Sequence, residues 1–139
     1  MRVIKLSSVA VRSIRKAVQT DVEVCGFLVG HKTREQVCVE YARPVENIYD
    51  SKIAFAIGQE EYNAVLSEVD SHSRVVAIYH LHHGSPHLSC TDRHNILLYD
   101  LSWLVVSVSE KSRELRWKCF TPSRETIKRV AVKFDELIP

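Results

Sequence analysis

The chain has 139 residues, of which 45% are hydrophobic and 26% charged, and its formal net charge is +2. This length predicts a single domain spanning residues 1–139 with a core of its own. The near-neutral charge gives no electrostatic reason to expect a nucleic acid or a membrane surface as partner. Arg and Lys interrupt the apolar residues of 1–18, so we expect no signal peptide and a cytoplasmic protein.

Apolar periodicity along the chain predicts more strands than helices. In chain order the expected elements are a strand over 3–6, a helix from Ser7 or Ser8 to about 18, strands over 22–29 and 36–42 joined by a turn over 30–35, a strand over 53–57, a helix over 59–69, a strand over 74–82, a helix over 89–101, paired strands over 104–109 and 114–120, and a last strand over 129–134. This order indicates a mixed α/β or α+β fold with helices on the faces of a sheet.

The four cysteines form no C-x-x-C pair, which leaves a zinc finger or a thioredoxin-type site without support. They are Cys25, Cys38, Cys90 and Cys119. We expect buried thiols, because a disulfide would be unusual in the cytosol.

His80 and His82 are the strongest functional signal in the sequence. They end an apolar strand and are separated by one residue, so their side chains lie on the same strand face. Polar imidazoles at the end of a buried strand need partners, and a metal ion supplies them. Two imidazoles and one carboxylate leave a fourth position open for water, which is typical of catalytic zinc.

Asp92 is the candidate for the third ligand. The segment Ser89-Cys90-Thr91-Asp92 also has the spacing of a helix capping box, with Ser89 as the N-cap residue. The residues alone leave both roles open for Asp92. A helix N-terminus favours the ionised carboxylate, which is the form that a metal requires.

Glu23 is the candidate for a general base. It lies within an otherwise apolar strand, where a carboxylate is costly unless it is paired or functional. The alternative is a side chain that points outward from the strand into water. No H-E-x-x-H motif is present, so a hydrolytic base must come from a distant part of the sequence.

Taken together, these motifs resemble the JAMM (MPN+) metalloprotease family. Residues 23–30, EVCGFLVG, match its E-x-x-G-x-L-x-G strand, and His80, His82, Ser89 and Asp92 follow the order of its H-x-H-x7-S-x2-D pattern. The resemblance covers roughly residues 5–120. It implies a cytidine-deaminase-like three-layer fold, in which helices flank a central, mostly antiparallel curved sheet.

The resemblance also implies a role for each matched residue. His80, His82 and Asp92 would bind one Zn²⁺ per chain, and Glu23 would act as general base and then as general acid. Ser89 would donate a hydrogen bond to the developing oxyanion. The segment 83–88 is one residue shorter than in the family, which leaves His83 and His87 as alternative ligands.

The implied substrate is a ubiquitin-like or sulfur-carrier β-grasp protein, cut after its C-terminal Gly-Gly tail. An extended tail of this kind can bind by adding to a sheet edge. The short chain is similar to compact archaeal or bacterial members, and a homodimer stays open. The zinc protease hypothesis competes with a non-catalytic scaffold of the same fold, with another zinc hydrolase, and with a cysteine enzyme that uses Cys25 or Cys90.

Overall fold

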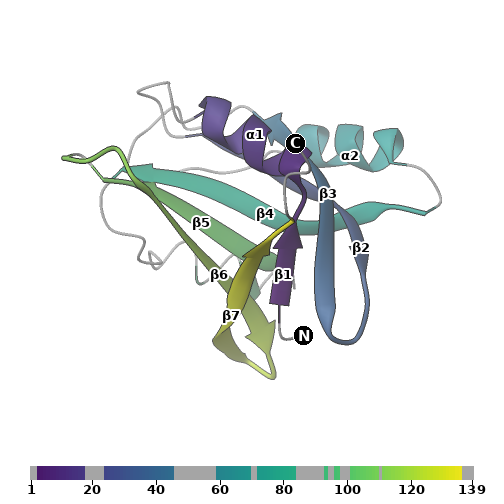
Figure 1. Cartoon of the computed structure of the whole chain (residues 1–139). Helices are drawn as coiled ribbons and strands as arrows, with labels where there is room; N and C mark the ends of the chain where they lie inside the picture. The colour runs from purple at the N-terminus through teal and green to yellow at the C-terminus, as the bar shows by residue number, and fades with distance from the viewer. Residues whose placement is uncertain are drawn as a thin grey trace.

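The computed structural model of the chain describes residues 3–17, 24–45, 59–69, 72–83, 93, 96–97, 101–109 and 111–135; within these ranges, the side chains of 59–62, 82 and 83 are not described. Seven strands and two short helices lie in the described residues (Figure 1). Their bounds are β1 Val3–Leu6, α1 Ser8–Ala17, β2 Cys25–Lys32, β3 Gln36–Val45, α2 Gln59–Glu68, β4 Arg74–His83, β5 Ser102–Val108, β6 Leu115–Ser123 and β7 Thr126–Phe134.

The strands form one closed, mixed β-barrel in the order β1-β3-β2-β4-β5-β6-β7. The short strand β1 closes the barrel because it pairs in parallel with both β3 and β7. β4 and β5 are also parallel, whereas the pairings of β2 with its two neighbours and of β6 with its two neighbours are antiparallel. The expected three-layer sheet flanked by helices is therefore wrong, and the fold is a mostly-β barrel.

The closure explains why the sequence pattern misled. Alternating apolar residues identify a strand but do not indicate which distant strand it joins. Val3 pairs with Gln36 of β3 on one side and with Ala131 of β7 on the other. The β3 and β7 strands of the barrel are therefore joined through β1, which has only four residues.

Most local predictions are confirmed, and their caps and turns explain the bounds. The Ser7 hydroxyl accepts a hydrogen bond from the Ala10 backbone N–H at 3.1 Å, which makes Ser7 the N-cap of α1. The predicted turn over 30–35 is too long, because β2 continues to Lys32 and the Thr33 hydroxyl accepts from the Gln36 N–H at 3.2 Å. The strand expected over 53–57 lies outside the described residues.

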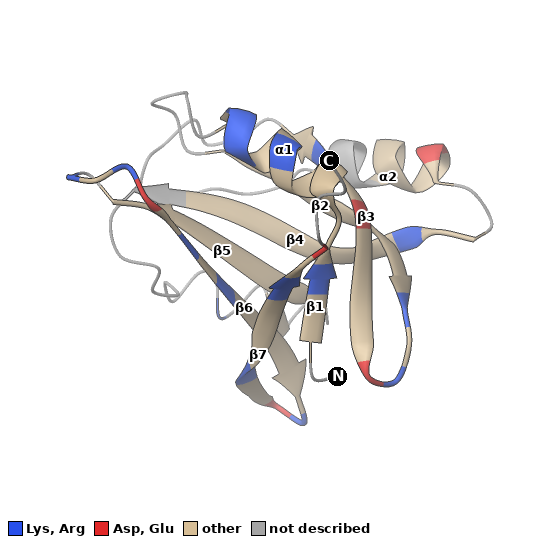
Figure 2. Ribbon diagram, in the orientation of Figure 1, with Lys and Arg blue, Asp and Glu red and all other residues tan. Residues whose placement is uncertain are grey.

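Two buried clusters hold the strands and helices together. One contains Ala10 and Ile14 of α1 with inward residues of the barrel strands. The other contains Val65 of α2, together with Phe27 and Trp103 from β2 and β5. The basic residues of α1 stay exposed on its other side, as Figure 2 shows in blue. Each helix therefore contributes an apolar stripe to a cluster and a polar face to water.

Gly26 and Gly30 are required by close approaches of β2 to its neighbours. A side chain at Gly26 would meet the Arg43 carbonyl oxygen and the buried ring of Tyr79. At Gly30, beside the register shift between β2 and β3, it would collide with the Cys38 carbonyl. The two glycines thus have a packing role in β2. No helix in the described part of the chain is long and apolar enough to cross a membrane.

Candidate functional site

His80 lies in the middle of the sheet near the carboxyl end of β4. Its register neighbours are Cys25 on β2 and Val105 on β5. Both neighbours belong to the cluster that includes α2, so His80 faces that side of the sheet by the alternation of strand side chains. Its side chain is only 4% exposed. Because burying a polar imidazole among apolar side chains is costly, this placement favours a functional role for His80.

Ser107 marks a second polar position on the same side of the sheet. It is 1% exposed, lies two residues after Val105 and pairs in register with His82. Its hydroxyl has no hydrogen-bond partner among the described residues. A buried hydroxyl left unsatisfied costs about 1–3 kcal/mol, so we expect a polar group to meet it. His80 and Ser107 together place two buried polar groups on the same side of the sheet at this end of β4 and β5.

Cys25 is beside His80 but is not an activated nucleophile. Burial raises the pKa of its thiol to about 12, and the Sγ atom lies 3.9 Å from the Val45 carbonyl oxygen, to which it donates. The thiol therefore stays protonated at neutral pH, and only a thiolate attacks efficiently. This removes Cys25 from the cysteine-enzyme hypothesis. The expectation of buried thiols is confirmed for Cys25 and Cys119, whereas Cys38 is half-buried and Cys90 lies outside the described residues.

Of the predicted site residues, the structure describes His80 with its side chain and His82 by its backbone alone. Glu23, Ser89 and Asp92 lie outside the described residues, so their roles stay predictions. Within the described residues, no three His, Cys, Asp or Glu side chains gather in a way that could hold a metal ion. The alternative ligand His87 also lies outside them.

The residue just before β2, Val24, is hydrogen-bonded to β4, the strand that carries His80 and His82. The Leu81 N–H donates to the Val24 carbonyl oxygen at 2.8 Å. Leu81 is the residue between the two histidines, and Val24 directly follows Glu23. The motif that contains Glu23 and the motif that contains the histidines are therefore neighbours in space, although they are far apart in the sequence.

Two cations border this region, and the sequence reasoning missed them. Val105 pairs with Lys118 and Ser107 with Arg116, so β6 brings both cations alongside the His80 and His82 rows. The signal was present as the alternation Arg116-Trp117-Lys118, but the pairing register of β5 with β6 was needed to place it. A positive border of this kind favours negatively charged groups on a partner.

Comparisons with known proteins define the family. The chain is 33% identical over 109 residues to the desampylase of Pyrococcus furiosus, a match that covers 76% of this chain and 74% of that protein. No family model matches the sequence. The solution structure of protein DSY2949 from Desulfitobacterium hafniense superimposes with a TM-score of 0.79 at 22% identity, covering 97% of this chain and 94% of that one. This protein therefore belongs to the desampylase family.

The assignment by resemblance to the JAMM family is corrected by these findings. The family assignment comes from the match to the desampylase. The observed fold is a closed barrel rather than the three-layer arrangement that the resemblance implied. The short motifs misled because a few spaced residues specify local chemistry, whereas the fold depends on pairings along the whole chain.

Proposed function

We propose that this protein is an isopeptidase that removes a ubiquitin-like modifier from other proteins. The observation that carries the proposal is the 33% identity to a desampylase over three quarters of the chain. The bond would be the amide after the Gly-Gly tail of a β-grasp modifier or sulfur carrier, because such a tail can enter a site in an extended conformation.

We assign the chemistry to the residues around the end of β4. His80 and His82, with Asp92, would hold one Zn²⁺, and the burial of His80 among apolar neighbours supports a role that requires desolvation. When bound, zinc polarises the scissile carbonyl and makes water more acidic. Glu23 would take the proton from the attacking water and deliver it to the departing amine, and Ser89 would donate to the oxyanion.

The position of Val24 beside Leu81 supports the assignment of Glu23. The 2.8 Å hydrogen bond between these residues fixes the chain immediately after Glu23 against the strand that carries the histidines. A base must act within hydrogen-bond reach of the reacting water. Glu23 is the residue before Val24, and this proximity to the histidine strand supports Glu23 as the base of a site at His80.

The test is cleavage of a ubiquitin-like protein joined through its Gly-Gly tail to a lysine reporter, with zinc content measured in the same samples. We expect Glu23→Gln to retain zinc and lose cleavage, and His80→Gln to lose both. Lys111→Gln, in the exposed turn between β5 and β6, is the control and should keep both. Normal cleavage by Glu23→Gln would refute the assigned base, and a zinc-free, inactive wild-type protein would favour the scaffold.

A further inference from the structure

A pocket of about 260 Å³ lies at the other end of the barrel from His80. Its lining residues come from the end of β2, the start of β4, the start of β5 and the end of β6: Lys32, Arg74, Val75, Val76, Leu101, Ser102, Thr121 and Pro122. Arg74 begins β4, and His80 lies six residues further along the same strand. At about 3.3 Å per residue, the two positions are roughly 20 Å apart. The pocket is therefore separate from the proposed active site.

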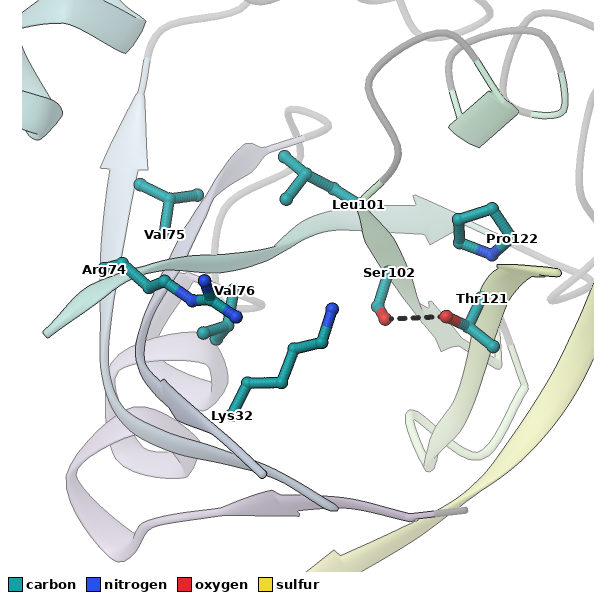
Figure 3. A pocket seen from close by; sticks show the side chains of 8 residues that line it. All are labelled: Lys32, Arg74, Val75, Val76, Leu101, Ser102, Thr121 and Pro122. Carbon is teal, nitrogen blue, oxygen red and sulfur yellow. Dashed lines mark hydrogen bonds between the residues drawn. The ribbon is translucent and has the colours of Figure 1, made fainter. Parts of the chain in front are cut away.

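Two cations extend their side chains into this pocket. Figure 3 shows Lys32 and Arg74 directed toward the same space from different strands. None of the eight lining residues is acidic. Within the described part of the chain, neither Lys32 nor Arg74 forms an ion pair. Two cations that converge without a carboxylate create a positive potential, which a bound anion would relieve.

Hydroxyl groups complete the opposite wall. The Ser102 Oγ donates to the Thr121 Oγ1 at 3.1 Å, and Ser102 is itself 6% exposed (Figure 3). Since Thr121 accepts from Ser102, its own hydroxyl proton is available to a ligand. An arginine fork, a lysine ammonium and a hydroxyl donor form a set that recognises the oxygens of phosphate or carboxylate.

We infer that this pocket is a second site, which binds a small oxyanion at Lys32, Arg74 and Thr121. Val75, Val76 and Leu101 supply the apolar part of the lining, and Lys32 and Arg74 are exposed, so an anion can reach them from solvent. Phosphate and carboxylate share the required chemistry. The site goes beyond the proposed isopeptidase function and does not depend on it.

The test is a titration of the isotope-labelled protein with inorganic phosphate and, separately, with acetate, followed by backbone amide NMR shifts at constant ionic strength. We expect saturable shifts for residues at the starts of β4 and β5. The anion that binds more tightly identifies the class of ligand. The absence of saturable shifts with both anions would overturn the inference.

Variants distinguish specific binding in the pocket from a nonspecific attraction of anions to exposed cations. Arg74→Gln and Lys32→Gln should each weaken binding about tenfold or more, because each removes a charge-assisted hydrogen bond. Thr121→Val should weaken it by a smaller factor. Arg34→Gln, an exposed cation in the neighbouring β2–β3 turn that does not line the pocket, is the matched control and should bind as the wild type does. Equal weakening by Arg34→Gln would overturn the inference, and unchanged circular dichroism spectra exclude unfolding as the cause.

Discussion

Replacing Gly26 with alanine tests the close packing of β2 against the strand that carries His80. The added methyl carbon would lie 2.5 Å from the Arg43 carbonyl oxygen and 2.5 Å from Cε1 of Tyr79. Ordinary contacts between such atoms are about 3.5–4 Å. Neither neighbour can yield easily, because the first is backbone in β3 and the second belongs to a ring that is 1% exposed.

The expected loss of stability follows from two opposing effects. Forcing a methyl group into a filled space costs about 1–3 kcal/mol. Alanine recovers about 0.5–1 kcal/mol relative to glycine, because glycine loses more backbone freedom on folding. The free energy of unfolding should therefore fall by about 1–2 kcal/mol, which lowers the Tm by about 3–8 °C in a domain of this size.

Thermal and urea unfolding, monitored by circular dichroism, measure this loss. Ala131→Gly is the control, because Ala131 is exposed in β7 and reports the glycine cost of a strand without any close contact. It should lose about 0.5–1 kcal/mol. If Gly26→Ala is as stable as the wild type or more stable, Tyr79 and β3 do not approach β2 closely enough to require glycine at this position.

Three further outcomes are expected. The pKa of the Cys25 thiol is raised from its unfolded value near 9 to about 12. The contribution of this thiol to stability is therefore full below pH 9 and is lost as the pH rises toward 12. The urea midpoint of unfolding should decline over that window, and an equal decline in Cys25→Ala would show that Cys25 is not the cause. Arg43 donates to both carboxylate oxygens of Glu68 at 2.9 and 3.0 Å and lowers the pKa of Glu68. Glu68→Gln should therefore speed amide hydrogen exchange in α2 above the usual glutamate pKa but not in acid, where the wild-type carboxyl is protonated. Equal exchange rates of variant and wild type at neutral pH would show that this ion pair does not stabilise α2. His83→Ala and His87→Ala should both retain stoichiometric zinc in elemental analysis, and loss of metal in either would show that the ligands were chosen wrongly.

Local patterns predicted the elements well because their causes are local. The β6 strand, for example, alternates Trp117 and Cys119 toward one cluster with Lys118 toward the other side, and this period of two is visible in the sequence. The same holds for Ser7, whose hydroxyl caps the helix that it precedes.

Barrel closure could not be predicted in the same way. It depends on β1, four residues whose sequence carries no signal for a partner more than a hundred residues away in β7. Strand pairing at that separation is selected by the packing of the whole core.

The candidate site was partly predictable. His80 was identified because a polar residue in a buried strand requires a reason, and the structure places it in the sheet interior. Ser107 and Lys118 were missed, since their relation to β4 exists only through the registers of β5 and β6. The pocket at Lys32 and Arg74 was missed for a similar reason, because it joins the ends of strands that are remote in sequence.

The activity that we propose is hydrolysis of the isopeptide bond of a ubiquitin-like conjugate. Intact mass spectrometry of a conjugate linked through its Gly-Gly tail to a lysine, incubated with the zinc-supplemented protein, tests it most directly. We expect two products, the modifier ending in a free Gly-Gly carboxylate and the target with a free lysine, whose summed mass exceeds that of the conjugate by one water. A conjugate that stays intact at stoichiometric amounts of the protein, across a panel of β-grasp modifiers, would contradict it.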